Sequence, residues 1–411
     1  MDSHLQATIK DIVNTTPIVD MHTHLFPPPF SDLCLTGIDE LLTYHYLVSE
    51  AFLWMKEDYE NFFHRSKTSQ AQVVWDELFV KRSPTSEAAL GILTILQELE
   101  IPFTTNLEEI RNRFQDLSIS NSDYADYILE KSNISSITMT NNPFDPLERK
   151  YWDKPQPFSR NTFTPALRVD PLISQWKETC RQLVEEGYEV TEDLSSETVK
   201  EIKRFLRVWV EKMEPVYMAA SLPWNFPTAS NESVLLEECV LAVCQEYRLP
   251  LSLMLGTKRR LNPQLDIAGD GVGQTNFDYL EKLCVQHPAQ KFLLTILSRE
   301  NQYELTVLGQ KFRNVMVFGC WWFLNTPQFM TEMTTMRMDQ LGQRFIPQHS
   351  DCRVLEQLLY KWKHFRKVFS SILIDRYQLL EEKGVPLTAD VIQQDVNQLF
   401  RDNFQEFIQE K

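Results

Sequence analysis

Eight short apolar runs recur along the chain, and many are separated by segments with helical spacing. SETVKEIKRFLRVWVEKM before the fourth run and TNFDYLEKLCVQH before the sixth are examples. Strands that alternate with helices indicate βαβ units and a parallel sheet. Eight such units predict an α/β fold closed into a (β/α)8 TIM barrel, with a doubly wound open sheet as the structural alternative. The runs are PIVDMHT (17–23), ISSITMT (134–140), FTPALRV (163–169), VYMAASL (216–222), LPLSLML (249–255), KFLLTIL (291–297), NVMVFG (314–319) and RFIPQHS (344–350).

The stretch between the first two runs interrupts this rhythm. It contains helical patterns such as GIDELLTYHYLVSEAFLWM and TSEAALGILTILQELE. It is too long for a βα loop and too apolar for a disordered linker. We therefore expect a distorted barrel with a helical insertion after strand 1, beside the barrel mouth. The predicted parts are a lead-in helix and strand 1 (1–34), the insertion (35–130), and the rest of the barrel with C-terminal helices (131–411).

Composition limits the classes of partner. The formal net charge is −16, so nucleic acid and anionic lipid surfaces would be repelled. No apolar run approaches the roughly 18 residues of a membrane helix, and the polar start is unlike a signal peptide. The seven cysteines are scattered and odd in number, which indicates reduced thiols. We expect a cytoplasmic protein that acts on a small molecule; a homo-oligomer is left open.

Two histidines close the first run and suggest a metal site. Asp20, His22 and His24 take alternate positions, so a regular strand places them on one face, at the barrel mouth. A pair of hydrogen-bonded polar residues at a strand end is the alternative. Asp351 follows the eighth run, which neighbours strand 1 in a closed barrel. Two imidazoles and one carboxylate suit Zn²⁺, Mn²⁺ or Fe²⁺. His349 is interpreted as packing or as support for a ligand.

The predicted site holds one metal ion. Runs five and six carry no histidine, and run four carries no lysine that could bridge two ions as a carbamate. AGDGVG (268–273) looks like a phosphate loop but lacks the strand-to-helix context and a following Lys-Ser/Thr. It is interpreted as a loop after the fifth strand. The KRR run at 258–260 is either a solvated face or a local positive potential for an anionic ligand.

Five motifs, in order along the whole chain, resemble those of the uronate isomerases. These are the glucuronate/galacturonate isomerases of the amidohydrolase superfamily, and the likeness is greatest to a shorter, divergent bacterial branch. The missing histidines in runs five and six fit this family. The motifs are DMHTHLFPP, DELLTYHYLV with His45 and Tyr46, ALRVDP with Arg168, FGCWWF with Trp321 and Trp322, and HSDCR with Asp351 and Arg353.

The resemblance implies a reversible aldose–ketose conversion, of D-glucuronate to D-fructuronate and of D-galacturonate to D-tagaturonate. Moving a carbonyl from C1 to C2 requires a proton to leave C2 and one to reach C1, through an enediolate that needs nearby positive charge. A carboxylate or a metal-bound water serves as base. Asp351 is the expected base. One divalent ion, with Zn²⁺ favoured, is the expected cofactor.

Arginine suits the substrate carboxylate because its planar guanidinium matches two oxygens. Arg168 ends the third run and is the expected anchor. Arg353 lies close to Asp351 and is expected to stabilise the enediolate. Arg299 is a weaker binding candidate. A structural salt bridge is the alternative for each arginine.

Four further residues are site candidates. His45 and Tyr46, on the first insertion helix, are expected to bond sugar hydroxyls or relay a proton, with helix-core packing as the alternative for Tyr46. Trp321 or Trp322 is expected to stack on the sugar, with the other in the core. Two rivals stay open: a mononuclear metal-dependent hydrolase using His22, His24 and Asp351, and an inactive barrel that binds sugar acids or a protein.

Overall fold

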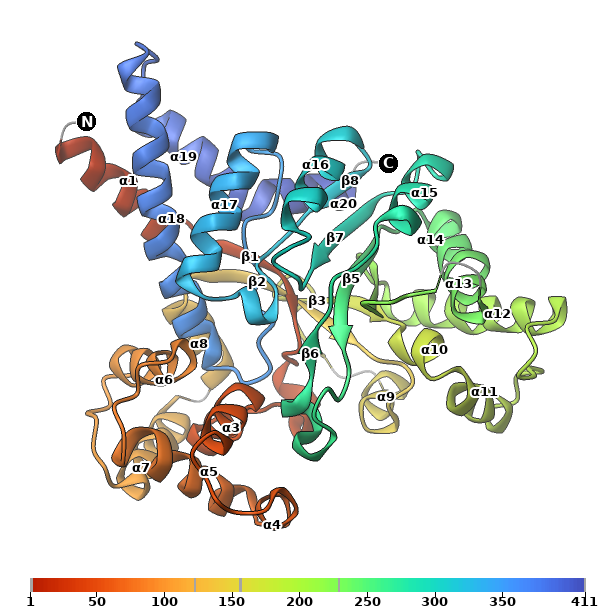
Figure 1. Cartoon of the computed structure of the whole chain (residues 1–411), viewed down its shortest axis with the longest axis horizontal. Helices are drawn as coiled ribbons and strands as arrows, with labels where there is room; N and C mark the ends of the chain where they lie inside the picture. The colour runs from red at the N-terminus through yellow and green to blue at the C-terminus, as the bar shows by residue number, and fades with distance from the viewer. Residues whose placement is uncertain (1–2, 122, 155–156, 228–229, 410–411) are drawn as a thin grey trace.

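The computed structural model describes residues 3–121, 123–154, 157–227 and 230–409. Its centre is a curved sheet of parallel strands in the order β1-β2-β3-β4-β5-β7-β8, surrounded by helices (Figure 1). The short β6 pairs with β5 in the antiparallel sense and lies outside this order. The predicted α/β fold, a distorted (β/α)8 barrel, is confirmed. The strands are β1 (Ile18–Thr23), β2 (Ile134–Asn141), β3 (Phe163–Arg168), β4 (Met218–Pro223), β5 (Leu251–Lys258), β6 (Gly271–Val272), β7 (Phe292–Ile296) and β8 (Val315–Val317).

The eighth apolar run does not form a regular strand, and that part of the prediction is wrong. It makes one isolated bridge, between Phe318 and Ile346. Pro347 has no N–H to donate to a ladder, and Asp351 has a positive φ of 52°, which ends extended pairing. The segment still fills the gap beside β1, because Asp351 N–H donates to the His22 carbonyl at 3.1 Å.

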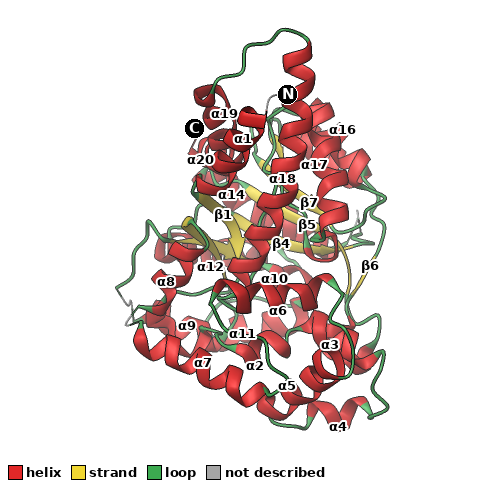
Figure 2. Cartoon of the chain, turned by 90° about the vertical axis from the view of Figure 1, so that its left-hand side faces the viewer, coloured by secondary structure: helices red, strands yellow, loops and turns green. Residues whose placement is uncertain are grey.

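Helices occupy the stretch between β1 and β2, as the insertion hypothesis requires. They gather at one end of the molecule, where the β5–β6 hairpin also lies (Figure 1). Figure 2 shows them as a helical layer on one side of the strands. The boundaries of the three predicted parts stay a prediction. The helices are α2 (Ile38–Leu42), α3 (His45–Phe52), α4 (Tyr59–Phe63), α5 (Lys67–Trp75), α6 (Glu87–Glu98), α7 (Leu107–Ser120) and α8 (Tyr124–Lys131), with a 3-10 turn at Pro28–Leu33 and a π turn at Asp76–Val80.

The remaining helices cover the outside of the sheet. Helix α1 (Ser3–Thr15) precedes β1, and the long α18 (Gln357–Glu382) packs against α1, α6 and α17. Between the strands lie α9 (Pro146–Asp153), α10 (Asp170–Ser174), α11 (Trp176–Glu185), α12 (Ser196–Met213), α13 (Asn231–Val234), a π turn (Leu235–Leu241), α14 (Ala242–Tyr247), a 3-10 segment (Pro263–Gly269), α15 (Asp278–Gln286) and α16 (Gln302–Lys311). After β8 come a 3-10 turn (Trp322–Leu324) and α17 (Pro327–Leu341). The chain ends with α19 (Ala389–Asn397), a π turn (Gln398–Asp402) and α20 (Asn403–Gln409).

Two buried layers fix the strands, because successive strand side chains point to opposite faces. One cluster includes Val19, Met21, Ala219 and Met254 and is completed by aromatic residues of α20. The larger cluster lies between the sheet and the helices and contains the alternate strand positions, such as Leu253. The ends of the strands remain free to carry polar residues at the mouth.

Among the described residues, none of the helices is both long and apolar enough to cross a membrane. All seven cysteines carry free thiols, six of them buried.

Candidate active site

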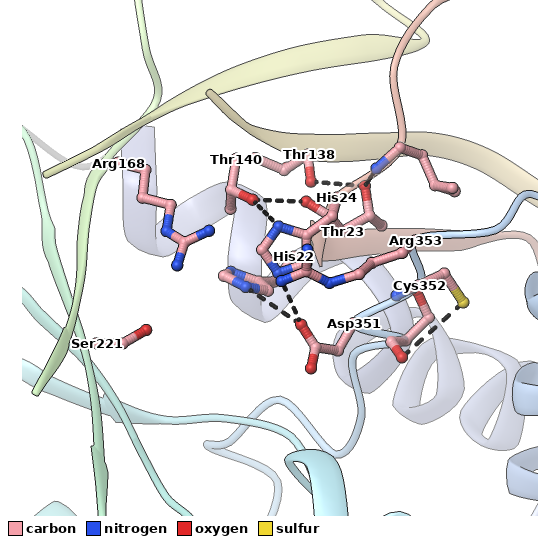
Figure 3. A network of polar contacts seen from close by, with 12 residues as sticks. His22, Thr23, His24, Thr138, Thr140, Arg168, Ser221, Asp351, Cys352 and Arg353 are labelled. Carbon is pink, nitrogen blue, oxygen red and sulfur yellow. Dashed lines mark hydrogen bonds and ion pairs between the residues drawn. The ribbon is translucent and has the colours of Figure 1, made fainter. Parts of the chain in front are cut away.

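The predicted metal group comes together at the end of β1. His24 Nε2 lies 3.2 Å from Asp351 Oδ1, and His22 Nε2 lies 3.6 Å from the same oxygen. One donor atom from each residue falls within 4.8 Å of the others. Figure 3 shows both imidazoles turned toward the Asp351 carboxylate. Two imidazole nitrogens and a carboxylate at such separations form a group that could hold a divalent metal ion.

Hydrogen bonds behind His22 fix its tautomer. The Tyr217 hydroxyl donates to the Met21 carbonyl at 2.7 Å, so its single proton is already used. His22 Nδ1 lies 3.2 Å from the same hydroxyl oxygen and must donate to it. His22 Nε2 is then unprotonated and presents its lone pair toward Asp351. This is the form in which imidazole binds a metal.

Thr140 of β2 fixes the tautomer of His24 in the same way. The Thr140 hydroxyl donates to the Thr23 carbonyl at 3.0 Å and lies 2.8 Å from His24 Nδ1. His24 Nδ1 therefore donates, and its Nε2 faces Asp351. Figure 3 shows this chain from Thr140 to Asp351. The Nε2 lone pairs of both rings thus face the Asp351 carboxylate.

Burial sets the charge states of the group. It lowers the pKa of His22 to about 3 and that of His24 to about 4, so both imidazoles are neutral at pH 7. Burial alone would raise the pKa of Asp351, but the close approach of the His24 and His22 rings holds that pKa well below the usual range. The group thus offers two neutral nitrogens and one negative oxygen.

Asp20 does not share the face of the two histidines, and that expectation is wrong. The register of β1 against β2 shifts between Asp20 and Thr23, so the alternation of faces is broken there. Asp20 Oδ2 instead accepts from Trp362 Nε1 of α18 at 3.0 Å. Its Oδ1 accepts from Ser350 N–H at 3.2 Å. Burial raises the pKa of Asp20 to about 6.

A pocket opens over the metal group. About 550 Å³ of space, which includes open solvent at the entrance, lies between its walls. Eight of the predicted site residues line it. The lining residues are His22, His24, Tyr44, His45, Arg168, Asp170, Ala219, Ser221, Met254, Arg259, Ile267, Trp321, Trp322, Asp351 and Arg353.

Three arginines approach the pocket from different elements. Arg168 Nε donates to Asp170 Oδ2 at 2.5 Å, and Asp170 Oδ1 accepts from Ser221 N–H at 2.9 Å. This fixes the Nε edge of Arg168, and Figure 3 shows its guanidinium directed toward the two histidines. Arg353 lies on the Asp351 side of the pocket. Arg259 follows β5 and is ion-paired with Asp270.

His45 and Trp322 bring unpaired polar atoms to the pocket. Within the described residues, His45 Nε2 and Trp322 Nε1 are both buried and have no hydrogen-bond partner. Burial lowers the pKa of His45 to about 3, so the ring is neutral. Trp322 has a φ of 49°, rare for a bulky residue. Buried unpaired donors and acceptors in a pocket suit a ligand with hydroxyl groups.

Trp321 also lines the pocket, so both tryptophans face it, and both belong to the smaller buried cluster as well. Tyr46 does not line it; its ring packs behind His45, with ring centroids 4.3 Å apart. His349 is fully buried with its ring centroid 5.5 Å from that of His22, and neither ring nitrogen has a partner among the described residues. His349 therefore packs against His22, a predicted metal ligand, and is not one of the three residues of the metal group.

Arg299 is the predicted residue that lies away from the pocket. Its side chain is 53% exposed and ion-paired with Glu332 of α17 at 3.0 Å. Strand β7 ends at Ile296, and the turn that follows directs Arg299 outward. The salt-bridge alternative holds at this position.

Sequence reasoning missed several lining residues. Arg259 belongs to the KRR run, which marked positive charge but not its direction. Asp170 lies two residues after Arg168 in ALRVDP, and Tyr44 precedes His45 in TYHY, so motif context could have identified both. Ser221 has no distinguishing pattern. AGDGVG, interpreted as a loop, contributes β6, and the hairpin brings Ile267 to the pocket.

No family model and no curated protein sequence matches the chain. A solved structure does match: a uronate isomerase from Bacillus halodurans C-125, 45% identical, with a TM-score of 0.96, covering 100% of this chain and 98% of that chain. The chain belongs to the uronate isomerase family. The resemblance carried by the five motifs is thereby confirmed.

Two more distant structures share the fold of this uronate isomerase family member. A uronate isomerase from Thermotoga maritima is 16% identical, with a TM-score of 0.78 over 99% of this chain and 98% of that one. A glucuronate isomerase from Caulobacter crescentus is 13% identical, with a TM-score of 0.78 over 98% and 94%. At these identities the comparison supports the fold alone.

Proposed function

We propose that this enzyme interconverts aldohexuronates and ketohexuronates, D-glucuronate with D-fructuronate and D-galacturonate with D-tagaturonate. One observation supports this most: His22, His24 and Asp351 meet in a pocket flanked by arginines, in a chain of the uronate isomerase family. The arginines supply positive charge for a substrate carboxylate and for an enediolate. The free cysteine thiols fit a reducing compartment, so the proposed location is the cytoplasm.

The proposed cofactor is one divalent ion, with Zn²⁺ favoured over Mn²⁺ and Fe²⁺. It would be held by His22 Nε2, His24 Nε2 and an Asp351 oxygen. The tautomers imposed by Tyr217 and Thr140 support this choice, since both leave Nε2 unprotonated. When bound, the ion supplies a positive charge that polarises substrate oxygens.

Asp351 is the proposed base. The C2–H bond breaks, its proton passes to the Asp351 carboxylate, and the electron pair forms the C1–C2 double bond while the C1 oxygen becomes negative. Asp351 then delivers the proton to C1, while the proton of the C2 hydroxyl passes to the C1 oxygen, so that C2 becomes the carbonyl carbon and C1 carries a hydroxyl group. Arg353, on the same wall, would stabilise the negative enediolate. An ionised Asp351 at neutral pH supports the first step.

Arg168 is the proposed anchor for the substrate carboxylate. Its Nε edge is held by Asp170, so the rest of the guanidinium is presented to the ligand with little loss of side-chain freedom. His45 Nε2 is proposed to bond a sugar hydroxyl, with Tyr46 packed behind it. Trp321 and Trp322 form an apolar wall against the sugar carbons. Arg299 has no part in this proposal.

The test is conversion of the substrate itself. Metal-loaded protein incubated with D-glucuronate, and separately with D-galacturonate, should yield the matching ketouronate in carbon NMR spectra. The reaction should also run backward from D-fructuronate. Failure with both aldouronates, together with hydrolysis of a lactone or amide panel, would replace the isomerase by the metal-dependent hydrolase.

A further inference from the structure

Two distant parts of the chain form one wall of the pocket. Tyr44 and His45 come from the insertion, whereas Asp351 and Arg353 come from the segment before α18. Their relative position depends on the contacts that join these two parts. The backbones meet at one parallel bridge between Leu35 and Val354, extended by a bond from Leu355 N–H to the Leu35 carbonyl at 3.0 Å.

Glu356 lies at this junction and is 0% exposed. Its Oε1 accepts from Gly37 N–H at 2.9 Å and from the Tyr124 hydroxyl at 2.9 Å. Gly37 directly precedes α2, at the start of the insertion, and Tyr124 begins α8, at its end. One oxygen therefore ties both ends of the insertion to the start of α18.

Burying the Glu356 carboxyl costs free energy of folding, and a role in positioning these elements would account for that cost. A buried carboxyl loses its hydration and regains it only through hydrogen bonds. Among the described residues, Glu356 Oε2 has no partner at all. Glu356 does not line the pocket, so it cannot touch a substrate there. A glutamine at this position would keep the two bonds without a buried charge.

We propose that Glu356 is a positioning residue, which with Tyr124 holds His45 in register with Arg353 and Asp351. This inference rests on the proposed uronate isomerisation and adds to it a residue outside the pocket. Gln357, the next residue, fixes the barrel side of this junction. Its Oε1 accepts from the backbone N–H groups of Arg353 and Val354 at 3.0 and 3.1 Å.

Three variants test whether Glu356 and Tyr124 affect the reaction by positioning the pocket residues. Glu356→Ala removes both bonds and should lower kcat/KM for D-glucuronate by about 10- to 100-fold, the effect of misplaced groups in a site. Glu356→Gln keeps an acceptor oxygen and should stay within about threefold of wild type. Tyr124→Phe removes one bond and should lower kcat/KM by about 2- to 10-fold, the usual range for one hydrogen bond.

Tyr377→Phe is the matched control. Tyr377 donates to Asp395 at 2.8 Å, a tyrosine–carboxylate bond between α18 and α19 that does not involve the insertion. It should lower the melting temperature as Tyr124→Phe does, yet leave kcat/KM unchanged. If the two variants lose equal stability and neither changes kcat/KM, the positioning role is refuted.

A double-mutant cycle with His45→Ala tests the route of the effect. If Tyr124 acts through His45, then Tyr124→Phe should change kcat/KM by less than about twofold in the His45→Ala background. Full additivity of the two changes would overturn the proposal. This readout does not respond to a general loss of stability.

Amide hydrogen exchange gives a test without substrate. In Tyr124→Phe, but not in Tyr377→Phe, the amides of α2 and α3 should exchange faster than in wild type. If wild type converts no uronate, the proposed reaction fails, and exchange alone then decides the positioning role. Unchanged exchange in α2 and α3 would refute it independently.

Discussion

Strand β1 and the segment Ile346–Arg353 each supply part of the metal group, but their backbones are held in different ways. β1 pairs with β2 along its length, with the register shift already described. The segment Ile346–Arg353 has one bridge, at Ile346. Backbone hydrogen bonds also join it to the end of β1, from Asp351 N–H to the His22 carbonyl and from His24 N–H to the Cys352 carbonyl, and side chains accept from two of its other N–H groups. The Asp20 carboxylate and the Gln357 amide oxygen accept from Ser350 and Arg353 N–H groups.

The difference shows two ways of placing a ligand. Strand β1 holds His22 near its end and His24 one residue beyond it, and hydrogen bonds behind the two rings set their tautomers. An irregular segment can turn sharply, so Asp351 takes a left-handed conformation that brings its carboxylate back toward β1. We expect the irregular segment to carry the chemistry and β1 to carry mainly the metal.

The largest expected effect comes from removing the carboxylate. Asp351→Asn should lower kcat by about 10²- to 10⁴-fold, the contribution of a general base, because the amide cannot accept the C2 proton. His22→Ala should mainly lower metal content. Steady-state kinetics and elemental analysis on both variants test this. Equal losses of kcat in the two at full metal loading would contradict the division between the regions.

The arginines extend the comparison to the substrate. Arg353→Met should lower kcat, because the enediolate charge exists only near the transition state. Arg168→Met should mainly raise KM, because the substrate carboxylate is present throughout. Each effect should be about 10- to 150-fold, the range for a bond to a charged group. Arg299→Met, a surface control, should change neither constant. Reversed effects would exchange the two roles.

The same difference between regular strands and irregular segments decides how much of the fold and the site could be predicted from the sequence. Seven strands and the histidine pair were predictable because apolar periodicity and HxH spacing are local. Asp351 was predictable because barrel closure brings the eighth run beside the first, although Pro347 prevents a regular strand there. Arg299 was expected at the site and lies outside it, and the direction of Arg259 was left open, since a turn and a hairpin decide where these two side chains point. No local pattern encodes those directions.

Removing the hydroxyl groups that fix the two histidine tautomers should give a smaller effect, on metal affinity. Thr140→Val and Tyr217→Phe each remove the acceptor behind one imidazole and leave the ring in place. Each should weaken metal affinity by about 10- to 100-fold, the usual cost of losing such a contact. Metal titration against a chromogenic chelator measures this. Thr138→Val is the control, since Thr138 contributes its carbonyl to the Thr23 hydroxyl and not its side chain. Unchanged affinity in both test variants would show that the tautomers are fixed otherwise.

The smallest expected effect concerns Asp20, whose Oδ1 joins His22 N–H of β1 to Ser350 N–H of the irregular segment. Its pKa is about 6 in the folded protein, against 3.8 as the ordinary value. Between these values the native state binds more protons than the unfolded state, so this residue's contribution to stability falls as pH rises.

The fall from pH 5 to pH 7 should be about 1.4 kcal/mol, the value of one pKa unit. It should be absent in Asp20→Asn. Urea unfolding of both proteins at several pH values, with metal removed by a chelator, measures the difference in their pH dependence. Because only this difference is compared, a constant loss of stability in Asp20→Asn does not affect the result. Parallel pH profiles would mean that Asp20 is ionised throughout, and that a permanent charge holds the two regions together.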